Sequence, residues 1–119
     1  MNRTATDELQ EALPPIASLI SKSEKALQKL IPGTWQHTML QENLRALHIA
    51  FALMKGRTNG ADVPRREDLQ AALRAFAAMR NRSEKAQAKF APGTSQHTLQ
   101  RNRLRAFRTA EALINAALK

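Results

Sequence analysis

Apolar residues recur along this chain at intervals of three and four positions, which is the spacing of one face of an α-helix. Four such stripes predict four helices, the second over residues 35–54 and the fourth over residues 95–118. The stripes of the first and third helices are Leu9, Leu13, Ile16, Leu19 or Ile20, Leu27 and Leu30, and then Leu69, Leu73, Phe76, Met79, Ala86 and Phe90. The stripes of the second and fourth helices are Leu40, Leu44, Leu47, Phe51 and Met54, and then Leu104, Phe107, Ala110, Ile114 and Leu118.

The segments between the stripes carry residues that end and begin helices. Pro32-Gly33-Thr34 separates the first two stripes, and the same three residues recur at positions 92–94. Glycine can end a helix in the left-handed conformation, and a threonine hydroxyl can accept a backbone N–H of the next turn as an N-cap. Each segment therefore predicts a tight turn between two helices.

Prolines and glycines mark irregular positions elsewhere. Pro14-Pro15 interrupts the first stripe, and because a proline ring clashes with the preceding helical turn, a break or kink is expected there. Residues 55–63 hold two glycines among turn-forming residues and predict a loop. Pro64 then suits the first turn of the third helix.

The chain matches itself when it is shifted by 60 residues. Without a gap, 22 of the 59 compared pairs are identical, and within residues 23–38 the count is 11 of 16. A fixed period of this kind indicates a duplicated supersecondary unit. We therefore divide a single domain, 1–119, into repeat one (4–55), a linker (56–63) and repeat two (64–119).

Each repeat predicts a helical hairpin, and a two-helix hairpin cannot bury its own apolar face. Two hairpins can bury theirs against each other, so the predicted fold is all-α: a four-helix bundle made from two tandem hairpins, in up-down order and with pseudo-twofold symmetry. The alternative is an open array that a second copy of the chain completes as a homo-oligomer, since two repeats make only a short solenoid.

The composition favours helices and narrows the function. Aromatic residues make up only 4% of the chain, and the scarcity of aromatic and β-branched residues argues against a sheet. There is no cysteine, which excludes disulfides and thiolate chemistry. No apolar run approaches the roughly 20 residues that cross a bilayer, so we expect a cytoplasmic protein that does not enter a membrane.

The charge of the chain is strongly basic and unevenly placed. The formal net charge is +9, to which residues 1–60 contribute +2 (7 basic and 5 acidic) and residues 61–119 contribute +7 (12 basic and 5 acidic). A field of this sign attracts acidic molecules. The expected partner is therefore an acidic protein or a nucleic acid, bound through repeat two.

The block that both repeats retain is polar and surrounds the two turns. Lys25 and Lys29 approach the end of one helix, while Thr34, Gln36 and His37 open the next, whose free N–H groups attract anions. The preferred interpretation is structural, because cations offset the dipole at a helix C-terminus and threonine caps a helix. The candidate contacts to an anion or partner are Lys25, Lys29, Thr34, Gln36, His37, Lys85, Lys89, Thr94, Gln96, His97, Arg101, Arg105 and Arg108.

Other polar residues do not predict catalysis. His37 and His48 are 11 positions apart, about 16 Å along a helix, so they cannot share a metal ion, and no metal or cofactor is expected. Ser23 and Ser83 lack the strand–turn–helix setting of a nucleophile. We interpret them as small residues at a close contact between helices.

Three positions differ between the repeats in chemically useful ways. Trp35 is replaced by serine, His48 by Arg108, and Phe51 by Glu111. We expect Trp35 to lie in the core or to staple the turn, with a protruding binding anchor as the alternative. We expect Glu111 to pair with Arg108 or to reach outward.

The sequence thus predicts a non-enzymatic helical binding module whose basic second repeat contacts an acidic macromolecular partner. One alternative is a nucleic-acid-binding protein, whose phosphate contacts would be salt-dependent. That alternative lacks a recognition-helix signature, a zinc knuckle and an aromatic platform for stacking bases. A second alternative is a binder of small anionic ligands at the two Pro-Gly-Thr turns.

Overall fold

The computed structural model describes residues 4–56 and 63–119, and every regular element within these ranges is an α-helix. The four helices are α1 (Ala5–Gln28), α2 (Trp35–Met54), α3 (Arg66–Ala88) and α4 (Ser95–Leu118). The all-helical prediction with four helices is confirmed, and the bounds of α2 and α4 are those that the apolar stripes predict. Among the described residues, no helix has the combination of length and apolarity needed to cross a bilayer.

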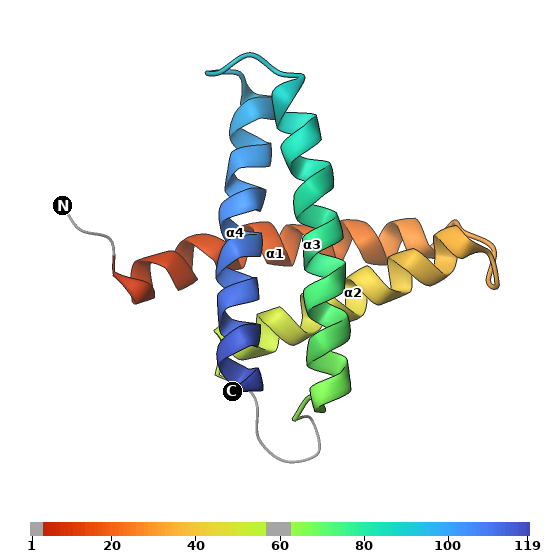
Figure 1. The fold of residues 1–119 in the computed structure, drawn as a ribbon. Coiled ribbons are helices and arrows are strands. Elements are labelled where there is room, and N and C mark those ends of the chain that lie inside the picture. Colours follow the sequence, from red (N-terminus) through yellow and green to blue (C-terminus); the bar gives the residue numbers. More distant parts are fainter. Residues whose placement is uncertain (1–3, 57–62) are drawn as a thin grey trace.

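The helices form two pairs that lie across each other. Figure 1 shows α1 beside α2 and, crossing them, α3 beside α4. The molecule extends 43 and 41 Å in two directions and 20 Å in the third, which is the thickness of two layers of helices about 10 Å in diameter. This arrangement differs from the near-parallel helices of an up-down bundle. The pairs meet at their middles, and both turns project beyond the crossing.

The core lies where the two pairs cross. Its largest fully buried side chains come from all four helices, and all belong to the predicted apolar stripes. They are Phe76, Phe107, Ile16, Leu47 and Ile114. The rings of Phe76 and Phe107 lie 5.8 Å apart between centroids and are tilted by 55°, a favourable arrangement for two aromatic rings.

The turn between α1 and α2 is a β-turn that follows the helix end. α1 stops at Gln28, because the ring of Pro32 would clash with the carbonyl of that residue and Pro32 also restricts Ile31 to extended conformations. The N–H of Thr34 donates to the carbonyl of Ile31 at 3.3 Å, and Gly33 has a φ of 90°, as the third residue of a type II turn requires. The left-handed glycine is thus present, but in the turn and not at the helix end.

The predicted threonine N-caps are confirmed. The Oγ1 of Thr34 accepts the N–H of His37 at 3.3 Å and donates to the carbonyl of Ile31 at 2.8 Å. Thr94 repeats both bonds at 3.2 and 2.8 Å, with Ala91 in the place of Ile31. Each threonine side chain therefore ties the β-turn to the first turn of the following helix.

Of the break or kink expected at Pro14-Pro15, the break is absent, because α1 continues through both prolines. The prolines remove the N–H groups that would bond to the carbonyls of Gln10 and Glu11. Both of those residues are exposed, so water can bond to the freed carbonyls. The buried Ile16 holds the same stretch of helix against the core.

The junction between the repeats is described only at its two ends. Gly56 follows the last residues of α2 with a φ of 71°, and residues 57–62 of the predicted loop lie outside the described residues. Pro64 was predicted to belong to the first turn of α3. That prediction is wrong, because α3 begins at Arg66 and Pro64 precedes it. Arg65 is the N-cap residue, and its N–H donates to the carboxylate of Asp68 at 3.2 Å.

Candidate functional site

Three of the four arginines of α4 share one face, which we call the arginine face. Arg101, Arg105 and Arg108 are four and three residues apart, so they fall within an arc of about 60° along about 10 Å of helix. All three are exposed, and none forms an ion pair with any carboxylate in the described ranges. Glu8 of α1 lines a shallow groove with Arg105 and Arg108, but it is not ion-paired with either.

The acidic residue of α4 does not neutralise the arginine face. The Oε1 of Glu111 accepts the Nε of Arg80 on α3 at 3.0 Å, and a guanidinium nitrogen of Arg80 lies 3.9 Å from Glu84. The expected pairing of Glu111 with Arg108 is therefore wrong. Glu111 replaces an apolar residue of the other repeat, and its side chain is only 22% exposed, so it faces the neighbouring helix and not the solvent.

The polar residues around the first turn mostly serve the turn itself. The hydroxyl of Thr34 is used for capping and takes the N–H of His37. His37 is half-buried, whereas Lys25, Lys29 and Gln36 are exposed. No hydrogen bond or ion pair joins the two lysines to the threonine, glutamine or histidine side chains in the described structure. The anion site predicted here remains a prediction.

The second turn has the same arrangement. Thr94 caps α4 through the N–H of His97. Lys85, Lys89 and Gln96 are exposed, while Thr94 and His97 are half-buried.

Trp35 lies on the surface, which overturns the expectation that it packs in the core or staples the turn. It is 70% exposed, and the neighbouring Ile31 is 73% exposed. The reason is positional: the tryptophan begins α2 at the projecting end of the pair, beyond the helices that cross it (Figure 1).

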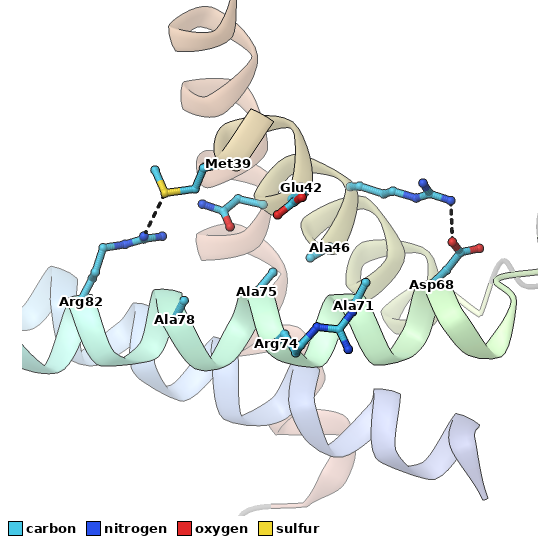
Figure 2. Close-up of a pocket in the computed structure, with 12 residues that line it drawn as sticks. Met39, Glu42, Ala46, Asp68, Ala71, Arg74, Ala75, Ala78 and Arg82 are labelled. Atoms are coloured by element: carbon cyan, nitrogen blue, oxygen red, sulfur yellow. Dashed lines mark hydrogen bonds and ion pairs between the residues drawn. The ribbon is translucent and has the colours of Figure 1, made fainter. Parts of the chain in front are cut away.

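A groove of about 440 Å³ runs between α2 and α3 (Figure 2). One end is closed by an ion pair of 2.6 Å between Arg45 and Asp68, and the other by a hydrogen bond of 3.6 Å from Arg82 to the sulfur of Met39. Five alanines line the groove: Ala46 on α2, and Ala71, Ala72, Ala75 and Ala78 on α3. Figure 2 shows Ala71, Ala75 and Ala78 in a row along α3.

A second groove, between α1 and α4, is lined at equivalent positions of the repeat. Its lining residues are Glu11, Pro14, Pro15, Ser18, Leu99, Asn102, Arg103 and Arg105. Shifted by 60 positions, each of the eight falls on a residue that lines the first groove. The two prolines of α1 occupy the places of Arg74 and Ala75. The prolines therefore form part of a groove wall at the contact with α4.

A third hollow of about 300 Å³, which we call the central notch, is lined by all four helices. Most of its lining residues are pairs of equivalent positions, 60 residues apart. These pairs are Leu19 and Met79, Ser23 and Ser83, Leu40 and Gln100, Asn43 and Arg103, and Leu47 and Phe107. Arg82 and Ala86 complete the lining. The notch therefore combines an apolar floor with six polar or charged side chains.

Two polar side chains of the central notch are nine-tenths buried. Asn43 is 8% exposed and Ser83 is 7% exposed, and neither side chain makes a hydrogen bond to any part of the chain that is described. No fully enclosed side-chain nitrogen or oxygen in those parts lacks a partner. The polar atoms of these two side chains are therefore not fully enclosed: Ser83 lines the central notch, and Asn43 lines both the notch and the groove between α2 and α3.

Arg103 lines the central notch beside them and has a perturbed pKa. Burial lowers the pKa of its guanidinium from the ordinary value, although an arginine keeps its charge in any such setting. No carboxylate in the described structure pairs with it. The notch thus holds a half-buried cation without a counter-ion.

Sequence reasoning did not single out Asn43 or Arg103, and it interpreted Ser83 only as a small contact residue. A signal was present at Asn43, which follows Leu40 by three positions and precedes Leu47 by four. It therefore belongs to the apolar stripe of α2, where a polar side chain is out of place. Within the described residues, no three histidine, aspartate or glutamate side chains group closely enough to hold a metal ion.

Comparisons of the chain with protein-family models, with curated proteins and with solved structures find no match.

Proposed function

We propose that this protein is a helical binding module, not an enzyme, and that the arginine face of α4 contacts an acidic macromolecular partner. The observation that carries the proposal is the exposed, unpaired state of Arg101, Arg105 and Arg108. Three guanidinium groups within about 10 Å can each form short, bidentate hydrogen bonds to carboxylates or phosphates. The excess positive charge of residues 61–119 adds long-range attraction.

An acidic protein is the partner that the surface favours over a nucleic acid. Proteins that bind single strands or loops stack bases on aromatic side chains. The exposed aromatic side chains among the described residues are Trp35 and Phe90, which lie at the two turns and not on the arginine face. A nucleic acid would therefore be held by its phosphates alone.

The proposal is tested with two probes, a fluorescently labelled poly-glutamate peptide and a labelled DNA duplex, by fluorescence anisotropy. In the test variant Arg101, Arg105 and Arg108 are replaced by Gln. In the matched control Lys22, Lys25 and Lys29, which are also exposed and spaced along one helix face, are replaced by Gln. The two variants lose the same charge from different surfaces.

We expect poly-glutamate binding to weaken at least tenfold in the arginine variant and less than threefold in the lysine control. If both variants lose the same affinity, net charge alone explains binding and the proposal fails. Tighter binding of DNA than of poly-glutamate would support the nucleic-acid alternative. In that case, three phosphate contacts predict a loss of about 40-fold between 50 and 200 mM salt.

We also propose that the two repeats are related by an approximate twofold axis that passes between α2 and α4 at the central notch. The support is the correspondence of the two grooves and of the five residue pairs in the notch, all at a shift of 60 positions. The absence of cysteine from the sequence fits a place in the cytoplasm, which we include in the proposal.

A further inference from the structure

Asn43 and Ser83 bring unmet hydrogen-bonding capacity to the central notch. A primary amide offers two donors and one acceptor, and a hydroxyl offers one donor and two acceptor positions. Both side chains are more than nine-tenths buried and have no partner in the described chain, but their polar atoms are not fully enclosed. A molecule that enters the notch can therefore bond to them in place of water.

Arg103 supplies a charge to the same space. It is two residues from both Arg101 and Arg105, which places it about 160° around α4 from each of them and therefore away from the arginine face. Its guanidinium is half-buried and has no counter-ion in the described structure. Arg82 of α3 also lines the notch, and its only described bond is the weak one to the sulfur of Met39.

The floor of the notch is apolar. Leu47 and Phe107 are almost completely buried beneath it, and Met79 is 7% exposed. The volume of about 300 Å³ is at the lower end of the range for small-molecule sites, which also combine an apolar lining with a few convergent polar groups. A ligand of this site therefore needs one anionic group and a small apolar body.

We propose that the central notch binds a small organic anion, with its carboxylate or phosphate group against Arg103 and Asn43 and its apolar body over Leu47 and Phe107. This site is distinct from the arginine face, because it uses the opposite side of α4. It is also distinct from the turns, since none of the turn residues lines it. Ordered water could bond to Asn43 and Ser83, but it would leave the charge of Arg103 without a counter-ion.

The test uses isothermal titration calorimetry on the full chain with four probes. Hexanoate and hexyl phosphate carry both features of the proposed ligand, inorganic phosphate lacks the apolar body, and 1-hexanol lacks the charge. We expect at least one of the two hexyl anions to bind, and to bind at least tenfold more tightly than inorganic phosphate and 1-hexanol. The preferred headgroup identifies whether the natural ligand is a carboxylate or a phosphate compound.

Two variants then locate the site. Arg103→Gln should weaken binding of the preferred hexyl anion at least tenfold, while Arg66→Gln, which removes an arginine that lines none of the described hollows, should leave it within twofold. Failure of both hexyl anions to bind the wild-type chain would overturn the proposal. Equal weakening by Arg103→Gln and Arg66→Gln would overturn it as well.

Asn43→Leu separates a binding role from a structural one. Leucine keeps the branched skeleton of asparagine and removes an amide that has no partner in the described chain, so the urea midpoint of the free protein should stay close to that of the wild type. Binding of the hexyl anion should fall at least tenfold in the same variant. A lowered midpoint together with unchanged binding would show that Asn43 serves the fold and would overturn its place in the site.

Discussion

Replacing Phe76 by alanine tests whether the crossing of the two helix pairs is the core of this protein. Phe76 is completely buried and contacts Phe107 with a centroid distance of 5.8 Å. Truncation of a buried phenylalanine removes apolar contacts and leaves a cavity, at a cost of about 3–5 kcal/mol. For a chain of this size, whose m-value in urea is about 2 kcal/mol/M, a loss of about 4 kcal/mol lowers the unfolding midpoint by about 2 M.

The matched control is Phe90→Ala, in the same repeat. Phe90 follows the end of α3 and is 38% exposed. Because part of its ring is already in water, Phe90→Ala should lower the free energy of unfolding clearly less than Phe76→Ala. Both variants are measured by circular dichroism at 222 nm during urea unfolding. Equal destabilisation by the two changes would refute the assignment of Phe76 to the core. A double-mutant cycle of Phe76→Leu and Phe107→Leu should give an interaction free energy of about 0.5–1.5 kcal/mol between the two rings.

Three further changes test the local structure by urea unfolding. Thr34→Ala should lower the free energy of unfolding by about 0.5–2 kcal/mol, because it removes the N-cap of α2 and the bond to the turn. The control is Thr38→Ala, at an exposed position. Gly33→Ala should cost about 1–3 kcal/mol through backbone strain alone, since an added Cβ at φ 90° meets no atom within 4 Å. Pro14→Ala should raise stability by about 1–3 kcal/mol, because it restores a helical N–H; a lowered midpoint would show that the proline contact with α4 outweighs it.

The apolar stripes predict the largest fully buried side chains, but not how the helix pairs cross, nor that Trp35 and Phe90 are exposed. The period of Phe76, Phe107, Ile16 and Leu47 identifies the apolar face of each helix, and all four are buried. An apolar face does not by itself set a crossing angle, which depends on the shapes of the side chains at the contact.

The retained alanines carry part of the missing information about the crossing. Alanine stands at positions 46 and 50 of α2 and at the equivalent positions 106 and 110 of α4, and all four are at most 1% exposed. They lie four residues apart on two helices that contact each other. Small side chains at that spacing allow two backbones to approach closely, so they indicate where α2 and α4 meet.

The candidate sites differ in how far the sequence revealed them. The arginine face could be predicted because helical geometry alone places Arg101, Arg105 and Arg108 together. The central notch could not, because Asn43 and Arg103 come from different helices and the packing of all four brings them to one hollow. The polar block around the turns attracted attention by its repetition, yet its threonines are used to cap helices.

Divergence of the two repeats gives the central notch its chemistry. If the halves are related by an approximate twofold axis, as proposed above, equivalent residues lie on either side of the notch. The pair at positions 43 and 103 contributes one amide and one guanidinium, and Arg82 adds a second guanidinium whose equivalent, Lys22, does not line the notch. In the proposed complex, the anionic group therefore meets two guanidinium groups and one amide. On this proposal, the likeness of the two copies places equivalent residues around the hollow, and the differences between them give it the unlike polar groups that an anion would contact.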